Sequence, residues 1–130
     1  MTGGPQVGVY SYASSGADPK TQFVFNVGRF RDPQGQVQFA GKNGTDPTVQ
    51  DWILSDNRVK AVVRDCQILA MDLLKPHPPS DKPRTEWVSF SFFDHHGKWI
   101  APAVAELVAK DLTSKGFKVA VHHLTLRGKP

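Results

Sequence analysis

The sequence predicts a single α/β domain, spanning residues 1–130, in which helices pack on a mixed, mostly parallel sheet. Two observations lead to this fold class. Apolar runs with the period of a strand are separated by longer runs with helical spacing, in the order β-β-α-α-β-α-β. The region from Glu86 to Leu126 also has the strand, loop, helix and strand of a crossover unit, and strands joined in this way lie parallel.

The first strands are expected at Val7–Ala13, which alternates, and at Thr21–Val27, which is rich in Phe and Val. Ser14–Lys20 between them is expected to be a loop. Asp32–Thr45 contains three glycines and is expected to be a surface excursion with a short strand at Val37–Phe39.

Two helices are expected next. Asp46 followed by Pro47 is a typical helix start, with a capping carboxylate and a first-turn proline, and it introduces a short helix at Thr48–Leu54. A longer helix is expected at Asn57–Leu74, where apolar residues recur at spacings of three and four. Lys75–Arg84 contains four prolines and is expected to be a stiff, extended connection.

The crossover unit follows. Glu86–Phe93 is expected to be a strand, and Pro102–Lys115 is expected to be a helix that begins at a proline and ends at Gly116. A last strand is expected at Phe117–Leu124. We expect the two strands of the unit to be neighbours in the sheet, with Phe90, Phe92, Val119 and Val121 among their core residues.

The Asp94–Ala101 loop lies where α/β sheets bind ligands, beyond the carboxyl end of a strand. Its glycine permits close backbone approach, and the following helix start offers unpaired N–H groups to an anion. Most loops of this kind bind nothing, so the loop alone does not establish a site. The predicted ligand-binding residues join this loop to the ends of the first two strands: Ser11, Asn26, Arg29, Asp94, His95, His96, Gly97, Lys98 and Trp99.

Four stretches are similar to motifs of one protein family: Phe23–Pro33 (FVFNVGRFRDP), Gly44–Leu54 (GTDPTVQDWIL), Gly97–Leu107 (GKWIAPAVAEL) and the basic tail Thr125–Pro130 (TLRGKP). On these residues the chain resembles the C-terminal domain of the RNase adapter protein RapZ. The resemblance implies a phosphofructokinase-like fold. It also implies glucosamine-6-phosphate binding in the loop before the last long helix, and binding of a small RNA through basic residues.

The resemblance carries over only in part to the loop residues. The family's His-Arg pair, which would donate hydrogen bonds to a phosphate, falls on Trp99 and Ile100, and neither side chain can replace it. Gly97 and Lys98 match the motif. Asn26 stands at the acidic position of the family's first motif, and Arg29 matches its arginine after a one-residue insertion. His95 and His96 are alternative phosphate donors.

Several activities have no support in the residues. No G-x-x-x-x-G-K-S/T phosphate-binding motif occurs, so the ATPase activity of the family's N-terminal domain is not carried over. Serines such as Ser11 could be paired with a histidine, but no G-x-S-x-G motif is present, and Asp94 has no second carboxylate beside it. Because these motifs are missing, we expect no catalytic residues and no cofactor. Adjacent His95 and His96 cannot easily ligate one ion, so we also expect no metal. His122 and His123 are expected on opposite faces of a strand, one packed and one solvated.

The charge pattern indicates an anionic partner. The chain has a formal charge of +4 and a pI of about 9.4, and Lys115, Lys118, Arg127 and Lys129 are the predicted RNA-binding residues. The alternative is that these are ordinary solubilising surface charges. Cys66 cannot form an internal disulfide and is expected in the core. That lone thiol and the absence of an apolar run long enough for a membrane span predict a cytoplasmic protein that does not contact a membrane.

Two functions are therefore expected as alternatives, and an enzyme is a third alternative with less support in the residues. The first is a stand-alone, non-catalytic binding module for a phosphorylated metabolite, a nucleotide or RNA. The second is an adaptor that acts through a protein partner or self-association after loss of the phosphosugar site. Trp99 and Ile100 distinguish them: Trp99 could stack on a ligand, the two could form an exposed apolar patch, or both could turn inward.

Overall fold

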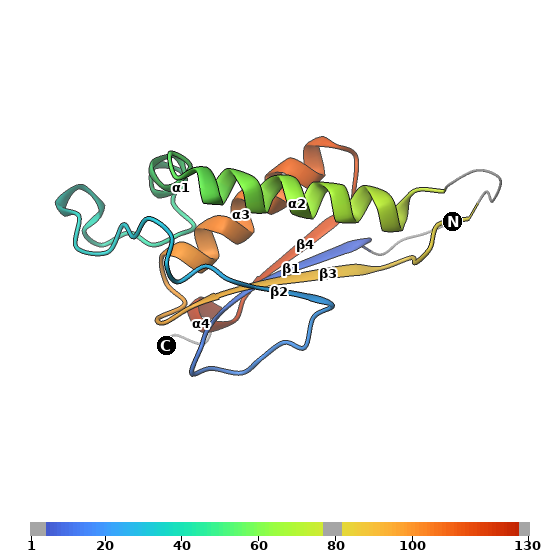
Figure 1. Cartoon of the computed structure of the whole chain (residues 1–130). Coiled ribbons are helices and arrows are strands. Elements are labelled where there is room, and N and C mark those ends of the chain that lie inside the picture. Colours follow the sequence, from blue (N-terminus) through green and yellow to red (C-terminus); the bar gives the residue numbers. More distant parts are fainter. Residues whose placement is uncertain (1–4, 77–81, 128–130) are drawn as a thin grey trace.

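The computed structural model describes residues 5–76 and 82–127, and it has the predicted α/β architecture (Figure 1). The strands are β1 (Val7–Ala13), β2 (Phe23–Asn26), β3 (Val88–Asp94) and β4 (Val119–His123). The helices are α1 (Pro47–Ile53), α2 (Asn57–Leu74), α3 (Ile100–Ser114) and α4 (Leu124–Arg127), with a 3₁₀ turn, η1, at Val37–Phe39. Among the described residues, no helix is both long and apolar enough to cross a membrane.

The four strands form one sheet in the order β2-β3-β1-β4, and every described pair is parallel. The prediction that β3 and β4 run parallel is confirmed, but the prediction that they are neighbours is wrong. Val9 of β1 lies between them and pairs with Phe90 on one side and Val121 on the other. β1 is buried along most of its length, which suits it to the centre, so the β3-α3-β4 crossover passes over it.

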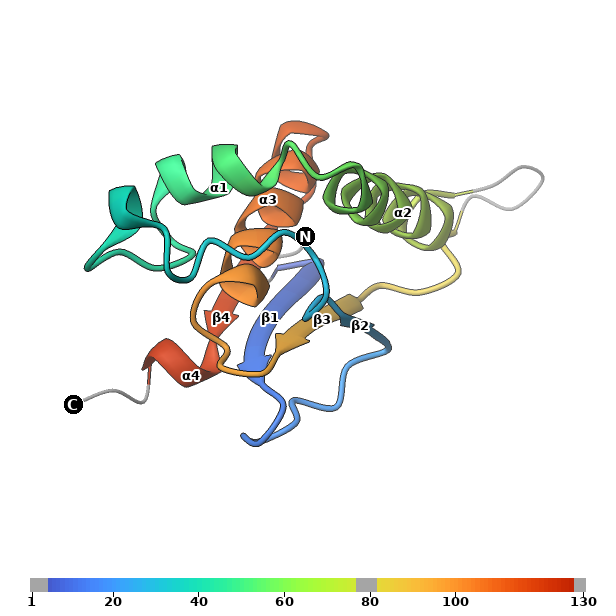
Figure 2. The same cartoon turned by 60° about the vertical axis from the view of Figure 1, so that its left-hand side comes forward.

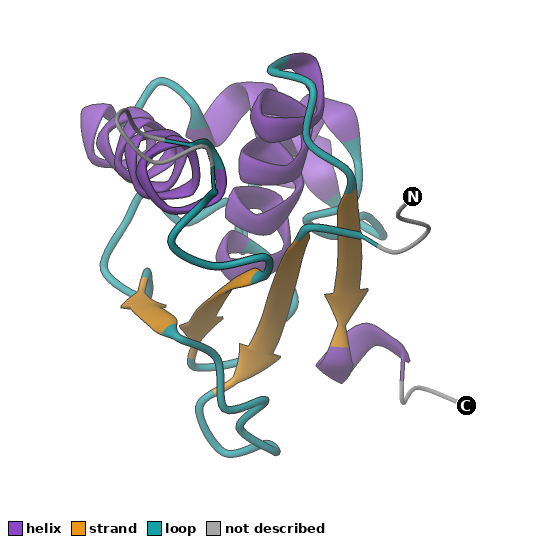
Figure 3. Ribbon diagram, turned by 90° about the vertical axis from the view of Figure 1, so that its right-hand side faces the viewer, coloured by secondary structure: helices purple, strands orange, loops and turns teal. Residues whose placement is uncertain are grey.

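Helices α1, α2 and α3 cover one face of the sheet (Figure 2). The core lies between the two layers, where Phe90 and Phe92 of the sheet and Val104, Val108 and Leu112 of α3 are fully buried. Within the described residues, no long helix packs on the other face of the sheet, which is covered in part by the segment that connects β1 to β2 (Figure 3).

Two predicted elements are corrected by the local structure. Val37–Phe39 is a 3₁₀ turn rather than a strand, because its bonds are local: Ala40 N–H donates to Val37 O. Helix α3 begins at Ile100, two residues before the predicted start. Pro102 is tolerated there because the N–H groups of a first helical turn have no intrahelical partner.

The remaining boundaries differ less. Gly116 ends α3 as predicted, with φ of +95°, while Phe117 N–H donates to Leu112 O. Helix α4 was not predicted, since it follows β4 without a capping residue. Of the proline-rich connection predicted at Lys75–Arg84, residues 77–81 lie outside the described part of the chain.

Candidate functional site

A cleft lies at the carboxyl ends of the strands, where four segments of the chain meet. Its larger part has a volume of about 510 Å³ and is lined by Gln34, Asn43, His96, Lys98, Trp99, Thr125 and Leu126. A smaller hollow shares three of these residues and adds Gly28, Asp32, Asp94, His95 and Ile100. The lining of the larger part combines the indole of Trp99, one lysine, one histidine, one leucine and three neutral hydrogen-bonding side chains. The smaller hollow adds the carboxylates of Asp32 and Asp94.

Asp94, the last residue of β3, organises the loop beneath the cleft. Its carboxylate is buried and accepts hydrogen bonds from Gly97 N–H, through Oδ1, and from Ala101 N–H, through Oδ2 at 2.8 Å. It thereby caps α3, because the N-cap residue Trp99 has no side-chain acceptor. The position where we expected an anion to meet the loop is thus filled by the protein's own carboxylate, and Gly97 N–H already has a partner.

Gly97 is required where it lies. Its φ is +66°, and a Cβ atom built there would come within 2.5 Å of Ala13 N and 2.7 Å of Thr125 Oγ1. Thr125 Oγ1 in turn accepts a hydrogen bond from Ala13 N–H at 2.9 Å. The end of β1, the loop after β3 and helix α4 are therefore locked together under the cleft.

The neighbouring side chains of the loop differ in accessibility. His95 and His96 are exposed, with their rings edge to face at 4.5 Å, and Lys98 Nζ lies 5.7 Å from the centre of the Trp99 ring. Ile100 is buried, whereas Trp99 is half-buried and lines both parts of the cleft. The two residues do not form a joint exposed patch, so the adaptor hypothesis has no support from this loop.

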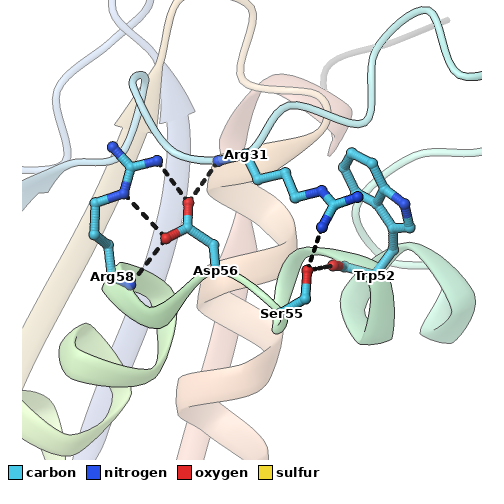
Figure 4. Close-up of polar contacts among 5 residues, drawn as sticks. All are labelled: Arg31, Trp52, Ser55, Asp56 and Arg58. Atoms are coloured by element: carbon cyan, nitrogen blue, oxygen red, sulfur yellow. Dashed lines mark hydrogen bonds and ion pairs between the residues drawn. The ribbon is translucent and has the colours of Figure 1, made fainter.

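A second segment of the cleft, residues 31–34, is attached through Arg31 to the junction of α1 and α2 (Figure 4). Arg31 donates from its backbone N–H to Asp56 Oδ2 at 2.8 Å and from Nη1 to Ser55 Oγ at 2.6 Å, and its guanidinium lies 3.9 Å from the centre of the Trp52 ring. Asp56 also accepts two side-chain hydrogen bonds from Arg58, and these hold the pKa of the Asp56 carboxyl well below its usual range. The exposed segment that carries Asp32 and Gln34 is therefore anchored at Arg31.

A third segment of the cleft, which carries Asn43, is fixed to the loop after β3 by Gly44. Its N–H donates to Lys98 O at 2.9 Å, and a Cβ atom there would lie 2.3 Å from Trp99 O. The buried Gln50 Nε2 donates to Gly44 O at 3.0 Å. Asn43 is thus placed beside the loop, although the sequence offered no signal for it beyond the glycine.

A comparison with known families agrees with the motifs. The model of the RapZ C-terminal domain matches residues 5–127. The chain belongs to the RapZ C-terminal domain family. No curated protein matches the sequence significantly.

Within this RapZ C-terminal domain, the motif at Gly97–Leu107 forms the end of the cleft loop and the first half of α3. Its glycine packs against β1. The two residues that replace the family's His-Arg pair have separate structural roles, since Ile100 enters the core and Trp99 forms part of the cleft.

Four predicted ligand residues of the RapZ domain do not line the cleft: Gly97, which is buried against β1, and Ser11, Asn26 and Arg29. Ser11 is fully buried, and its Oγ lies 2.7 Å from His123 Nδ1, while His123 Nε2 lies 2.7 Å from Glu106 Oε2. Asn26 is exposed and its Oδ1 accepts a hydrogen bond from Gly28 N–H at 3.0 Å. Arg29 is also exposed, outside the lining. The predicted residues at the first two strand ends therefore do not face the cleft.

The prediction for the two histidines of β4, opposite faces with one ring packed and one solvated, is confirmed in part. His122 stacks on Tyr10 with ring centres 4.9 Å apart, while His123 belongs to the polar chain with Ser11 and Glu106. They lie on opposite faces of the strand, as alternation requires. Neither is freely solvated, because the neighbouring β1 side chains partly bury both rings.

The predicted RNA-binding residues of the RapZ domain are not gathered at one place. Lys118 precedes β4 and Lys115 forms an ion pair with Asp111 at 3.1 Å, both at the amino end of the strand. Arg127 belongs to α4, beyond the carboxyl end, and Lys129 lies outside the described residues. Because β4 has five residues, about 16 Å of strand separates the two ends.

Sequence reasoning missed four residues that line the larger part of the cleft, Gln34, Asn43, Thr125 and Leu126, and three that line only the smaller hollow, Gly28, Asp32 and Ile100. Gln34 and Asn43 lie in the excursion at Asp32–Thr45, and Thr125 and Leu126 lie in the unpredicted α4. The usable signals were two of the resembling stretches: Gly44, which marks a close backbone approach without naming its partner, and the tail from Thr125, which was interpreted only as a basic segment.

Proposed function

We propose that this domain is a non-catalytic binding module for a small phosphorylated metabolite or nucleotide, held in the cleft beside Trp99. One observation carries the proposal: a cleft of about 510 Å³ is built at the carboxyl ends of parallel strands, with an aromatic ring, a lysine and neutral polar groups around it. That volume suits a phosphorylated sugar or a mononucleotide.

The phosphate group is assigned to Lys98, His96 and Thr125 at the cleft rather than to the start of α3. Asp94 already bonds the N–H groups of Gly97 and Ala101, and its negative charge would repel a second anion there. Lys98 is exposed beside the cleft and brings three donors, and Thr125 has a hydroxyl hydrogen to offer because Oγ1 acts as an acceptor toward Ala13.

The non-phosphate part of the ligand is assigned to Trp99. A half-buried indole presents a flat apolar surface on which a sugar or base can stack. Gln34 and Asn43 line the same space and can fix the orientation of hydroxyl or base groups.

Catalysis has no comparable support. Both oxygens of Asp94 are hydrogen-bonded to the backbone, so this carboxylate is not placed to act as a base on a ligand. Ser11, although it is hydrogen-bonded to a histidine, is fully buried and cannot reach a substrate.

Binding can be measured by isothermal titration of the full chain with glucosamine-6-phosphate and with AMP, using unphosphorylated glucosamine as the ligand control. We expect at least one phosphorylated compound to bind, and we expect Lys98→Ala to weaken its binding about tenfold, as loss of a charge-assisted hydrogen bond does. Lys60→Ala, an exposed lysine on α2 away from the cleft, is the matched control and should bind as the wild type does. Equal affinities of Lys98→Ala and the wild type, or no binding of any phosphorylated compound, would refute the proposal.

RNA remains a second expected partner of this family. The wide separation of Lys115 and Lys118 from Arg127 indicates that RNA contact, if confined to one face, would use one end of β4 and not both.

A further inference from the structure

The two parts of the cleft carry opposite charge. The larger part holds Lys98 and Thr125, to which the phosphate group is assigned, whereas the smaller hollow holds the carboxylates of Asp32 and Asp94. Trp99 lines both parts, so a ligand in contact with its indole can reach from one to the other. A carboxylate only accepts hydrogen bonds. The end of the ligand that lies away from the phosphate therefore meets acceptors, which select a group with N–H or O–H donors.

Of these two carboxylates, Asp32 has the capacity to bind a ligand. Both oxygens of Asp94 are already hydrogen-bonded to backbone N–H groups. Asp32 is exposed, and the hydrogen bond that it accepts within the described chain comes from Gln34 N–H to Oδ1, at 2.9 Å. Its other oxygen and the second lone pair of Oδ1 remain for a ligand. A carboxylate in this state can accept two parallel hydrogen bonds from neighbouring N–H groups.

Asn43, in the larger part of the cleft, offers the complementary group. Its Oδ1 accepts hydrogen bonds from Thr45 N–H at 2.8 Å and from Thr45 Oγ1 at 2.7 Å. Because a backbone N–H can only donate, these bonds fix the side-chain amide with its oxygen toward Thr45, and among the described residues its Nδ2 hydrogens have no acceptor. Asn43 is half-buried, and Gly44 fixes its segment to the cleft loop. Toward a ligand, Asn43 is therefore a donor.

Guanine matches this set of groups. Its N1–H and N2–H donors lie side by side, as a carboxylate requires, and its O6 and N7 atoms accept hydrogen bonds from an amide N–H. Adenine has one amino group and no N1–H, so it leaves one of the two positions at Asp32 without a donor. A pyrimidine ring covers less of the Trp99 indole, and a hexose phosphate offers it no aromatic surface at all.

We propose, on the basis of the function assigned to this cleft, that its ligand is a guanine nucleotide. Guanine stacks on Trp99, its N1–H and N2–H groups donate to Asp32, and Asn43 donates to O6. Lys98 Nζ lies 5.7 Å from the centre of the Trp99 ring, so one ligand can stack on the indole while its phosphate meets the ammonium group. The negative charge of Asp32 repels the phosphate and so fixes the direction in which the nucleotide lies. Asp32 is thus the specificity-determining residue.

The test is isothermal titration of the full chain with GMP, IMP and AMP, and with glucosamine-6-phosphate as the non-aromatic comparison. We expect GMP to bind about tenfold or more tightly than AMP, because a site arranged for two N–H donors rejects an analogue that lacks one. IMP keeps N1–H and lacks the N2 amino group, so its affinity should lie between the two.

Asp32→Asn tests the contact with the base. Asparagine keeps an acceptor for Gln34 N–H but replaces one carboxylate oxygen by a donor, so it should remove most of the preference for GMP over AMP. Asp18→Asn is the matched control. Asp18 is also exposed and accepts a hydrogen bond from the backbone N–H two residues on, that of Lys20 at 2.8 Å, but it lies outside the lining of the cleft. This variant should keep the full preference, and circular dichroism checks that both variants are folded.

The outcomes separate this proposal from the function of the cleft. AMP or glucosamine-6-phosphate binding as tightly as GMP overturns the guanine assignment and leaves the phosphorylated-ligand site standing. Binding of no phosphorylated compound overturns both. A preference for GMP that Asp32→Asn retains in full overturns the role of Asp32, since the base would then be recognised by other groups.

Discussion

Asp94 and Asp56 perform the same task at the starts of two helices, but in different surroundings. Asp94 caps α3 from the end of β3, is 6% exposed, and accepts hydrogen bonds from two backbone N–H groups. Asp56 is the N-cap of α2, lies closer to solvent, and shares its carboxylate between backbone N–H groups and the guanidinium of Arg58. The first holds the floor of the cleft and the second holds one wall.

The difference lies in what replaces each carboxylate when it is lost. The Asp56 side chain is only 9% exposed, but its donors belong to the exposed residues Arg31 and Arg58, which water can reach once the carboxylate is removed; its loss should therefore cost little more than the cap. No water replaces Asp94 easily, and its two buried donors would stay unpaired. Burial, and not the number of hydrogen bonds, should therefore decide which aspartate matters more for stability.

The largest effect is expected at Asp94. Asp94→Ala leaves the N–H groups of Gly97 and Ala101 without an acceptor, and should lower the free energy of unfolding by about 3 kcal/mol. For a domain of this size the Tm should fall by roughly 10 °C, measured by differential scanning calorimetry.

The Asp94 prediction has a rescue control. A formate ion can occupy the space of the missing carboxylate and accept from both N–H groups, so formate should raise the Tm of Asp94→Ala and leave the wild type unchanged at equal ionic strength. A variant as stable as the wild type would show that the buried bonds contribute nothing.

The two sites also differ in how far the sequence could predict them. A cap such as Asp56 or Asp46 is adjacent to its own helix, so local chemistry identifies it; the Asp46-Pro47 start was found in this way. Asp94 bonds a residue seven positions away across a loop that has no periodicity. Its capping role depends on the loop's path, so the sequence predicted Asp94 only as a ligand residue; the structure places it in the lining of the smaller hollow with both oxygens hydrogen-bonded to the backbone.

The same distinction explains the rest of the site and the fold. Strands and helices with strong periodicity, such as β1 and α2, were predicted closely, because side-chain spacing encodes the buried face. The position of β1 between β3 and β4 was not, because spacing gives no strand order. Gln34 and Thr125 were missed for a related reason: they are brought together only when an excursion and a short helix pack on the same loop.

An intermediate effect is expected at Asp56. Asp56→Ala removes an N-cap and should lower the free energy of unfolding by about 1 kcal/mol. Asp56→Asn is the matched control, since asparagine keeps the cap but removes the charge that pairs with Arg58, and it should cost less at neutral pH.

The Asp56 pair of variants also predicts a pH dependence. Hydrogen bonding to Arg58 depresses the folded-state pKa of Asp56, so its contribution is complete above the unfolded pKa of about 3.9 and is lost as the pH falls through the lower, folded value. The Tm difference between the wild type and Asp56→Asn should therefore shrink below about pH 4. A difference that stays constant down to acid unfolding would contradict the assigned pair.

The smallest effect is expected at Asp46, the N-cap of α1. Its Oδ1 accepts hydrogen bonds from Thr48 N–H at 2.8 Å and from Thr48 Oγ1 at 2.6 Å, and the side-chain bond is the main cause of the lowered pKa of this carboxyl. Both partners are exposed, so water replaces the carboxylate readily, and Asp46→Ala should shift the Tm less than Asp56→Ala does. Thr48→Val is the matched control, because it keeps the backbone bond and removes only the hydroxyl. A Tm decrease for Asp46→Ala as large as that for Asp94→Ala would show that exposure does not determine the order of effects at the three aspartates. It would instead indicate that the short helix α1 stabilises Gly44 and its segment of the cleft through Gln50.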